Sequence, residues 1–405
     1  MNYLDRTIAP HIRKASATFR SLILTGQRQV GKTTLLKNLA EKKRGFVSLD
    51  NLAHRKLARE DPELFLQHFP PPVIIDEIQY APELFPYIKI HNDAHPDHKG
   101  AFWMTGSQKY KLIAHAQESL AGRAAIIDLY GLSYAEKTGG ARNSKPFVPA
   151  WKPPVERRKL SLNEVYKLIW EGAMPEPFAN PRLDRAAYYV SYVQSFIERD
   201  VRDFYGVSRP LEFYELVRVC AARTGSLLNF AALARDAGVD LKTAKTWVGI
   251  LERAGLVYLL RPYFPNVTKR LIKTPKLYFL DTGLCAHLTR WTSPEVLRDG
   301  AMAGAILETY VVGEILKSYC HNGLEPPLWF YRDDDQNEID LVIEKNGVLH
   351  PVEIKRSAAP SPSDCAAFRL LEKLGKTAGL GAVICLRPER APLSRAVVSI
   401  PVWEI

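Results

Sequence analysis

A short glycine-rich segment near the N-terminus holds the first residues whose spacing could do chemistry. Residues 26–33 follow the pattern G-x-x-x-x-G-K-T, between an apolar stretch and a stretch with helical spacing of apolar residues. Gly26 and Gly31 let the backbone curl so that its N–H groups face a phosphate. Lys32 would bridge the β- and γ-phosphates of a nucleotide, and the Thr33 hydroxyl would ligate Mg²⁺. The residues predicted to cradle the nucleotide are Gly26, Gln27, Arg28, Gln29, Val30, Gly31, Lys32, Thr33 and Thr34.

Two adjacent acids follow a second apolar stretch. The segment PPVIIDEIQ predicts a buried strand over residues 73–75 that ends at Asp76 and Glu77. Asp76 would hold Mg²⁺ through water, and Glu77 would act as a base or orient the attacking water. Two carboxylates after an apolar run are by themselves more typical of a solvated strand end. Beside the glycine-rich loop, they predict a site that binds and hydrolyses ATP.

Two further segments would complete this site. AFWMTGSQ predicts a strand that ends at Ser107 and Gln108, whose polar side chains could sense the γ-phosphate. Arg123 could act as a finger toward the nucleotide of a neighbouring subunit, which requires an oligomer. The alternative for Arg123 is an ordinary surface arginine, or one that pairs with Glu118.

The order of these motifs resembles a known family. LTGQRQVGKTTLL, VIIDEIQYAPELF, MTGSQ and ESLAGRAAIIDLYGLS resemble segments of the predicted AAA-type ATPases of bacteria and archaea. GAMPEPF (172–178), FIERDVRDF (196–204) and KLYFLDTGLCAHL (276–288) resemble mid-chain signatures of the same family. In that family, a C-terminal domain of unknown function related to restriction endonucleases follows the ATPase. The resemblance implies this architecture over nearly the whole chain.

A second group of acids lies in the C-terminal quarter. A metal-dependent nuclease of the restriction-endonuclease type needs three carboxylates, which hold Mg²⁺, and a lysine that stabilises developing charge. The chain offers Glu308 on a predicted helix, Asp340 on one strand, and Glu353 and Lys355 on the next. Glu353 and Lys355 are two residues apart, so they face the same side of a strand. Glu308, Asp340 and Glu353 are therefore the predicted metal ligands.

A simpler interpretation of the same segment needs no chemistry. NEIDLVIEKNGVLHPVEIK is also what a β-hairpin with charged ends requires, with its turn at residues 345–347. Under this interpretation the domain keeps the fold and only binds a partner. The residues predicted to be catalytic, over both sites, are Lys32, Glu77, Arg123, Glu308, Asp340, Glu353 and Lys355.

The middle of the chain predicts a winged helix-turn-helix. Its second helix would expose Lys242 and Lys245 near its start, where a recognition helix contacts DNA. The alternative is a module that contacts protein or separates the other domains. The basic residues of the predicted two-stranded wing, which would contact phosphates, are Lys269, Arg270, Lys273 and Lys276.

These patterns predict an α/β chain with five parts. Arg199 and Asp200, at the end of a lid helix, would report the nucleotide state or form an ordinary ion pair. The predicted parts are an AAA-type P-loop ATPase core (1–136), a Pro/Gly-rich basic linker or exposed loop (137–158), a helical lid (159–208), the winged helix-turn-helix (209–290) and a restriction-endonuclease-like α/β domain (291–405).

Composition narrows the class of partner. The 405 residues carry a formal net charge of +11, which favours a polyanionic partner such as DNA. The five cysteines are scattered, which fits a reducing cytosol. The N-terminal residues lack the apolar core of a signal peptide, and no apolar run is long enough to span a bilayer. We expect a cytoplasmic protein without a membrane partner.

Together these patterns predict an ATP-hydrolysing enzyme that uses Mg²⁺ to bind and cleave DNA. The alternative is a regulatory ATPase switch, whose winged-helix and nuclease-like domains only bind a protein or DNA partner.

Overall fold

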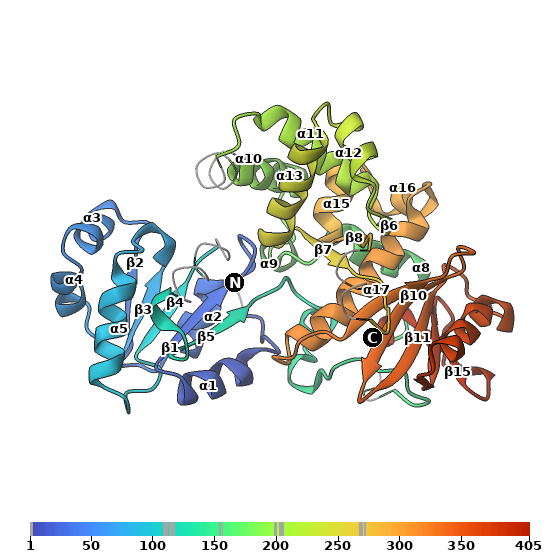
Figure 1. The fold of residues 1–405 in the computed structure, drawn as a ribbon, viewed down its shortest axis with the longest axis horizontal. Helices are drawn as coiled ribbons and strands as arrows, with labels where there is room; N and C mark the ends of the chain where they lie inside the picture. Colours follow the sequence, from blue (N-terminus) through green and yellow to red (C-terminus); the bar gives the residue numbers. More distant parts are fainter. Residues whose placement is uncertain are drawn as a thin grey trace.

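The computed structural model describes residues 3–107, 112, 118–153, 155, 157–197, 201, 206–266, 270 and 273–405. It has three parts, which Figure 1 colours in chain order. An N-terminal sheet with its helices (blue) and a C-terminal sheet (orange to red) lie at opposite ends, and a group of helices (green to yellow) joins them. One hydrophobic cluster runs through all three parts, from Ile8 to Trp403.

The N-terminal sheet is parallel, with the order β2-β3-β4-β1-β5. Leu22 and Leu24 pack on one face of β1 and Ile23 packs on the other. Because helices cover both faces, the three central strands β1, β3 and β4 are buried along their whole length. The strands are β1 (Ser21–Thr25), β2 (Gly45–Ser48), β3 (Val73–Asp76), β4 (Phe102–Thr105) and β5 (Ala124–Asp128).

Helices cover both faces of this sheet, and one of them follows the glycine-rich loop. The glycine-rich loop lies between β1 and α2, so the N-terminus of α2 is at the carboxyl edge of the sheet. The carboxyl ends of β1, β3 and β4 meet at that edge, where ligands of open α/β sheets bind. One face carries α1 (Ala9–Thr18) and α2 (Lys32–Leu39), and the other carries α3 (Leu52–Glu60), α4 (Pro62–His68) and α5 (Leu84–Ala94).

The middle part consists mainly of helices, several of which start at a polar N-cap. Ser133 and Ser161 form capping boxes, and Asp240 accepts the Thr243 N–H at 2.9 Å to start α13. The helices are α7 (Tyr134–Lys137), α8 (Leu162–Glu171), α9 (Pro175–Ala179), α10 (Arg185–Ser195), α11 (Pro210–Ala222), α12 (Phe230–Asp236), α13 (Leu241–Arg253), α15 (Thr282–Leu288) and α16 (Pro294–Asp299).

A small antiparallel sheet, in the order β6-β8-β7, accompanies these helices. Its strands are β6 (Ser226–Leu227), β7 (Val257–Leu260) and β8 (Lys276–Phe279). The β7–β8 pair lies where the sequence predicts a two-stranded wing, but the residues just after β7 bond to β9 of the C-terminal sheet. The Phe330 N–H donates to the Arg261 carbonyl at 3.1 Å, and the Tyr263 N–H donates to the Phe330 carbonyl at 2.6 Å. The wing is therefore joined to the C-terminal sheet.

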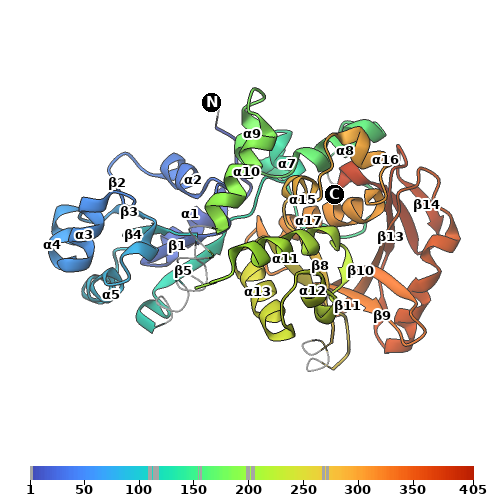
Figure 2. The ribbon, with the colours of Figure 1, turned by 90° about the horizontal axis from the view of Figure 1, so that it is seen from above.

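The C-terminal part packs a long helix, α17 (Ala303–Cys320), against a mixed sheet in the order β14-β15-β13-β11-β10-β9, with β12 beside β11. Figure 2 places α15 and α17 between the middle helices and this sheet. The strands are β9 (Leu328–Arg332), β10 (Glu338–Lys345), β11 (Val348–Ile354), β12 (Thr377–Ala378), β13 (Gly381–Cys385), β14 (Ala391–Ser394) and β15 (Val397–Pro401).

The hairpin that the sequence predicts is present. β10 and β11 pair antiparallel, with Leu341 opposite Val352. Asn346 and Gly347 make the two-residue turn, both with positive φ (53° and 78°). None of the helices in the described part of the chain is both long and apolar enough to cross a membrane.

The segment predicted as a linker or exposed loop, residues 137–158, is pinned along the C-terminal part. The Phe147 N–H donates to the Ser318 hydroxyl at 2.9 Å, and the Phe147 carbonyl accepts from the Tyr319 hydroxyl at 2.7 Å. Arg390 reaches the Ala150 carbonyl at 2.5 Å. The described residues of this proline- and glycine-rich segment therefore lie against the C-terminal part and connect it to the N-terminal part.

A buried ion pair connects the glycine-rich loop to the end of α17. Arg6 donates to the Val30 carbonyl (2.9 Å), the Tyr130 carbonyl (2.6 Å) and Glu136 Oε1 (3.1 Å). The Nδ1 of His321, just after α17, lies 3.4 Å from the same Glu136 oxygen. The side chains of Arg6, Glu136 and His321 are at most 4% exposed. The loop and α17 therefore share one desolvated charge cluster.

This cluster predicts a pH dependence of stability. Burial lowers the pKa of His321 to about 4. Glu136 and Glu314 act to raise this pKa, and the Arg6 and Lys317 cations act to lower it further. The unfolded histidine takes up a proton below its ordinary pKa of about 6.5, and the folded one does so only near 4. We therefore expect the free energy of unfolding to fall by about 2 kcal/mol between pH 7 and pH 5.

Urea unfolding at the two pH values measures this loss. His321→Leu should remove most of it, whereas the matched control His68→Leu, at an exposed position, should retain it. An unchanged pH dependence in His321→Leu would contradict the assignment.

Candidate functional site

The glycine-rich loop has the backbone geometry that its glycines predict. Gly26 has φ of +138°, and a Cβ at this position would lie 2.2 Å from the Leu129 carbonyl oxygen, so only glycine fits. Gly31 has φ of +92° and is the N-cap of α2. Lys32 and Thr33 are the first two residues of α2. The free N–H groups and the positive end of α2 therefore face the loop, which suits a phosphate.

The polar side chains of the loop meet the end of β3. The Thr33 hydroxyl donates to Asp76 Oδ1 at 2.6 Å, and the Thr105 hydroxyl donates to the same oxygen at 2.5 Å. The Lys32 ammonium donates to the Gly26 and Gln27 carbonyls at 3.0 and 2.9 Å. A hydroxyl beside a carboxylate is a ligand set that fits Mg²⁺, so Thr33 and Asp76 would hold the ion.

Glu77 lies at the start of a strained turn beside this pair. It is a non-glycine residue with φ of +58°, its N–H donates to the Thr105 hydroxyl at 3.2 Å, and its carboxylate accepts from the Gln79 amide. Burial raises the pKa of Glu77, although the Lys32 ammonium acts in the opposite direction. A carboxylate with a raised pKa is a stronger base, which is the role predicted for Glu77.

Thr105 is a site residue that the sequence analysis missed. It is fully buried at the last position of β4, and it bridges Asp76 and the Glu77 backbone. The available signal was a hydroxyl at the end of an otherwise apolar strand, in the segment FWMT that precedes Gly106.

A cavity of about 750 Å³ adjoins the loop and gives room for a nucleotide. The N-terminal segment lines it through Tyr3 and Leu4, and the middle part lines it through Pro175 of α9 and Tyr188 of α10. The Tyr188 hydroxyl is buried and has no hydrogen-bond partner among the described residues. The loop residues that line this cavity are Arg28, Gln29, Val30, Gly31, Lys32, Thr33 and Thr34, together with Glu77.

Ser107 lies on another side of the loop. It lines a smaller cavity of about 240 Å³ together with Gly26 and Gln27, and the end of α13 forms the opposite wall through Glu252 and Gly255. Ser107 is therefore near the loop, as predicted. Gln108, Arg199, Asp200 and Lys269, which the sequence also singled out, lie outside the described residues.

Arg123 lies at the far edge of the N-terminal sheet from the loop. Its carbonyl accepts the Ser21 N–H at 3.1 Å, so it is level with the start of β1, whereas the loop follows the end of β1. Five residues of strand separate the two edges by roughly 16 Å. Its guanidinium is held by Asp93 at 2.5 and 3.0 Å. The predicted role of Arg123 toward a neighbouring subunit stays a prediction.

The C-terminal acids come together with a lysine that was assigned elsewhere. The Lys276 ammonium lies 3.0 Å from Glu308 Oε1, 2.5 Å from Glu338 Oε1 and 3.8 Å from Asp340 Oδ1. Its side chain is only 4% exposed. The expectation that Lys276 contacts phosphates from an exposed wing is therefore wrong, because β8 turns this side chain into the protein. We call Glu308, Glu338, Asp340 and Glu353 the acidic cluster.

The remaining members of the acidic cluster have partners of different kinds. Asp340 Oδ2 accepts the Ile354 N–H at 2.9 Å, and Glu353 Oε1 accepts from the Lys355 ammonium at 2.6 Å. Burial, with Asp340 nearby, raises the pKa of Glu353 to about 7. Within the described part of the chain, no three His, Cys, Asp or Glu side chains are grouped so as to hold a metal ion. The predicted Mg²⁺ ligands are neighbours, but a lysine lies among them.

The residues predicted to contact nucleic acid differ in exposure. Lys242 and Lys245 are exposed on the first turns of α13, as the prediction requires. Arg270 is not free to bind a phosphate. Its guanidinium donates to the Phe264 carbonyl, lies 3.3 Å from Glu344 Oε2 and stacks 4.2 Å from the centre of the Tyr263 ring.

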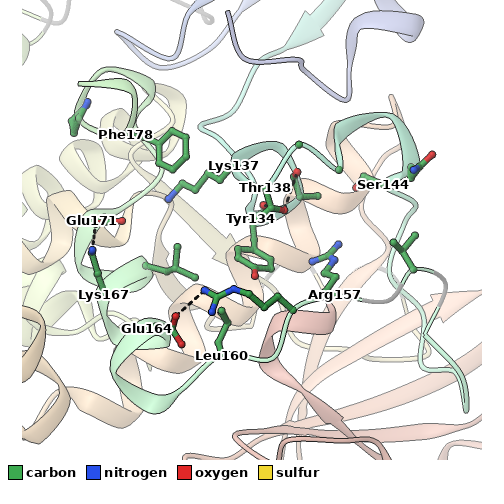
Figure 3. Close-up of a pocket in the computed structure, with 18 of the residues that line it drawn as sticks. Tyr134, Lys137, Thr138, Ser144, Arg157, Leu160, Glu164, Lys167, Glu171 and Phe178 are labelled. Carbon is green, nitrogen blue, oxygen red and sulfur yellow. Dashed lines mark hydrogen bonds and ion pairs between the residues drawn. The ribbon is translucent and has the colours of Figure 1, made fainter. Parts of the chain in front are cut away.

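A further cavity, of about 840 Å³, lies among α7, α8 and α9 (Figure 3). Its charged side chains pair with one another: Arg158 lies 2.8 Å from Glu164, and Lys167 lies 3.9 Å from Glu171. The Lys137 amine donates to the Gly172 carbonyl, and burial lowers its pKa to about 8. None of the predicted site residues in the described part of the chain lines this cavity.

Known families match three consecutive parts of the chain. The family described as "AAA domain" matches residues 18–138, which contain the loop, Asp76 and Glu77. Two families described as "Domain of unknown function", DUF8612 and DUF4143, match residues 162–295 and 303–405. The loop geometry and the first of these matches define the class of this protein as an AAA-type P-loop ATPase.

Relatives extend over the whole chain. Uncharacterized protein Rv2008c of Mycobacterium tuberculosis and uncharacterized protein Mb2031c of Mycobacterium bovis are each 30% identical to it over 405 residues, which span 99% of this chain and 84% of each relative. The chain therefore belongs to the same family as these two mycobacterial proteins.

Solved structures resemble the chain more distantly. A Walker-type ATPase of Pyrococcus abyssi is 16% identical, with a TM-score of 0.44 over 71% of this chain and 96% of that one. The RuvB Holliday junction branch migration motor of Thermotoga maritima is 14% identical, with a TM-score of 0.28 over 63% of this chain and 89% of that one.

The position of Glu77 predicts its effect on ATP turnover. Glu77→Gln should lower kcat for ATP hydrolysis roughly 10²- to 10⁴-fold, because the amide cannot accept a proton from water. The Kd for ATP should change by no more than about twofold, because Lys32 and the loop are intact. The control is Glu83→Gln, an exposed acid just before α5. Turnover in Glu77→Gln close to that of the control would exclude Glu77 as the base.

Proposed function

We propose that this protein is an ATP-driven switch, in which the nucleotide bound at the loop sets the state of the C-terminal part. The observation that carries the proposal is the attachment of α17 at both ends. One end is hydrogen-bonded to the chain that leaves the ATPase sheet, and the other end contributes Glu308 to the acidic cluster.

The C-terminal end of α17 holds the segment that follows β5. Glu314 Oε2 accepts the Tyr134 N–H at 2.9 Å, and the Lys317 ammonium donates to the Leu132 carbonyl at 2.9 Å and to Glu314 Oε1 at 2.6 Å. The same segment includes Tyr130, whose carbonyl is bound by Arg6. Because Arg6 also binds the loop, a displacement of the loop would reach α17 through direct contacts.

Glu308 lies nine residues before Lys317 on α17, about 14 Å along the helix. A packed helix moves as a unit, so a shift at one end repositions the side chains at the other. Both ends are buried, and the acidic cluster is held by a charged network that has little tolerance for displacement.

A second helix connects the loop to the predicted partner surface. A Cβ on Gly255, just beyond α13, would lie 3.8 Å from the Gln27 backbone nitrogen. Lys242 and Lys245 lie at the other end of α13, about 20 Å away along the axis. These exposed lysines and the net charge of +11 favour DNA as the partner. A protein partner at this surface is the alternative, and an oligomer that uses Arg123 would form at the N-terminal sheet instead.

In the ATP site, each residue has a defined task. The loop N–H groups and the Lys32 ammonium would bind the phosphates, and Thr33 and Asp76 would hold Mg²⁺, which neutralises charge on the phosphate oxygens when it is bound. Glu77 would accept a proton from the attacking water. The Thr105 hydroxyl, which bonds both the Glu77 N–H and Asp76, would hold these two residues in their relative positions. Product release would then relax the contacts through Arg6.

The switch predicts how ATP turnover responds to nucleic acid. DNA should change the rate of ATP hydrolysis, because α13 joins the nucleotide loop to the predicted DNA surface. This change should be the same in Asp340→Ala, because no cleavage is coupled to it. The rate without DNA should also be retained in Asp340→Ala, and it should be lost in Lys32→Met. A stimulation of about tenfold by DNA that disappears in Asp340→Ala would instead favour coupled cleavage.

The second candidate is the Mg²⁺-dependent nuclease that the sequence predicts. It is favoured by the grouping of Asp340, Glu353 and Lys355 at the ends of β10 and β11, and by the buried Glu353 Oε2, which has no hydrogen-bond partner among the described residues. Under this proposal, purified protein with Mg²⁺ or Mn²⁺ cleaves DNA or RNA, and Asp340→Ala and Lys355→Ala abolish cleavage without changing the Kd for ATP. Absence of cleavage on every substrate would dismiss it.

A further inference from the structure

The acidic cluster contains its own cation. The ammonium of Lys276 is 3.0 Å from Glu308, 2.5 Å from Glu338 and 3.8 Å from Asp340, so it lies between two of the three residues predicted to bind metal. The Tyr278 hydroxyl, two residues along β8, donates to the same Glu308 oxygen at 2.6 Å. Four carboxylates in a buried site repel one another strongly unless a cation lies among them.

The backbone fixes Lys276 in this position. Lys276 is the first residue of β8, where it pairs with Leu260 of β7 on one side and Leu227 of β6 on the other. β8 also packs on α17, which carries Glu308. The ammonium therefore comes from the centre of a three-stranded sheet, and a change of rotamer alone would leave it beside the acids.

The charges agree with this placement. Burial acts to lower the pKa of Lys276, but Glu308, Asp340 and Glu338 outweigh it and raise the pKa overall, so the group stays protonated. Glu353 completes the cluster from β11, and its Oε2 is buried without a partner among the described residues. That oxygen belongs to a neighbour of Asp340, and its hydrogen-bonding capacity is unused among the described residues.

We propose that Lys276 is the resident cation of the acidic cluster, that it excludes divalent metal ions from it, and that its removal leaves Glu308 and Asp340 to bind a divalent ion in its place. While β8 holds Lys276 among these acids, they do not form the Mg²⁺ site that the sequence predicts. The inference does not depend on whether the C-terminal part acts in a switch or cleaves nucleic acid.

Binding of Mn²⁺ alone, without nucleotide, tests this proposal on the full chain by electron paramagnetic resonance or calorimetry. Lys276→Met should gain one Mn²⁺ site per chain with a Kd at least about tenfold lower than any site in the wild type. The double variant Lys276→Met/Asp340→Asn should lose it, which separates this site from the ATP site at Thr33 and Asp76. The control is Lys273→Met, which removes an exposed lysine three residues earlier.

A second variant covers the case in which Lys276→Met does not fold. Lys276→Gln/Glu338→Gln removes one carboxylate together with the ammonium, and it should show the same new site and a rise in Tm on addition of Mn²⁺ that the wild type lacks. A folded variant that binds no more Mn²⁺ than the wild type overturns the proposal. So does a wild-type site of equal affinity that is lost in Asp340→Asn. Because ATP turnover is not a readout here, these outcomes are distinct from a failure of the switch.

Discussion

The contacts of Arg6 are the interaction on which the remainder of the structure depends. One guanidinium holds the carbonyl of Val30 in the glycine-rich loop, the carbonyl of Tyr130 after β5 and the carboxylate of Glu136. A buried arginine is stable only when its donors and its charge are satisfied, so these three groups constrain one another. The shape of the nucleotide loop is consequently tied to the chain that enters the middle and C-terminal parts.

The contacts of Arg6 help to explain how the three regions that match known families are held together. Segment 130–136 receives hydrogen bonds or ion pairs from both directions: Arg6 from the N-terminal side, and Glu314, Lys317 and His321 from α17. The segment predicted to be a linker continues along α17 and adds Phe147 to the same core. Nucleotide binding and the acidic cluster are therefore connected by packed, buried groups and not by a flexible tether.

Local patterns predicted the backbone geometry of the glycine-rich loop, for physical reasons. Gly26 and Gly31 have positive φ, α2 starts at Lys32, and Thr33 bonds Asp76, because a phosphate loop needs these residue types at fixed offsets. The turn at Asn346 and Gly347 followed from their tolerance of positive φ. Thr105 was missed because its role comes from β4 lying between β1 and β3, which is a fact of topology.

The C-terminal site shows what local sequence patterns could not predict. The order of Glu308, Asp340, Glu353 and Lys355 predicted a metal site, which stays a prediction, and it contained no information about Lys276, which lies between Glu308 and Asp340. That lysine reaches the cluster from β8, 32 residues before Glu308, and its side chain points inward because it lies, like Tyr278, on the face of β8 that packs on α17. A basic hairpin is ordinarily exposed, so local composition favoured the opposite orientation for both Lys276 and Arg270.

If α17 transmits the nucleotide state, amide hydrogen exchange of this helix must respond to nucleotide. Exchange would be compared with and without a non-hydrolysable ATP analogue, in the wild type and in Lys32→Met, which cannot grip the phosphates. The account predicts that nucleotide changes exchange in residues 26–33 and also in residues 303–320, in the wild type alone. Protection confined to residues 26–33, with α17 unchanged, would contradict it.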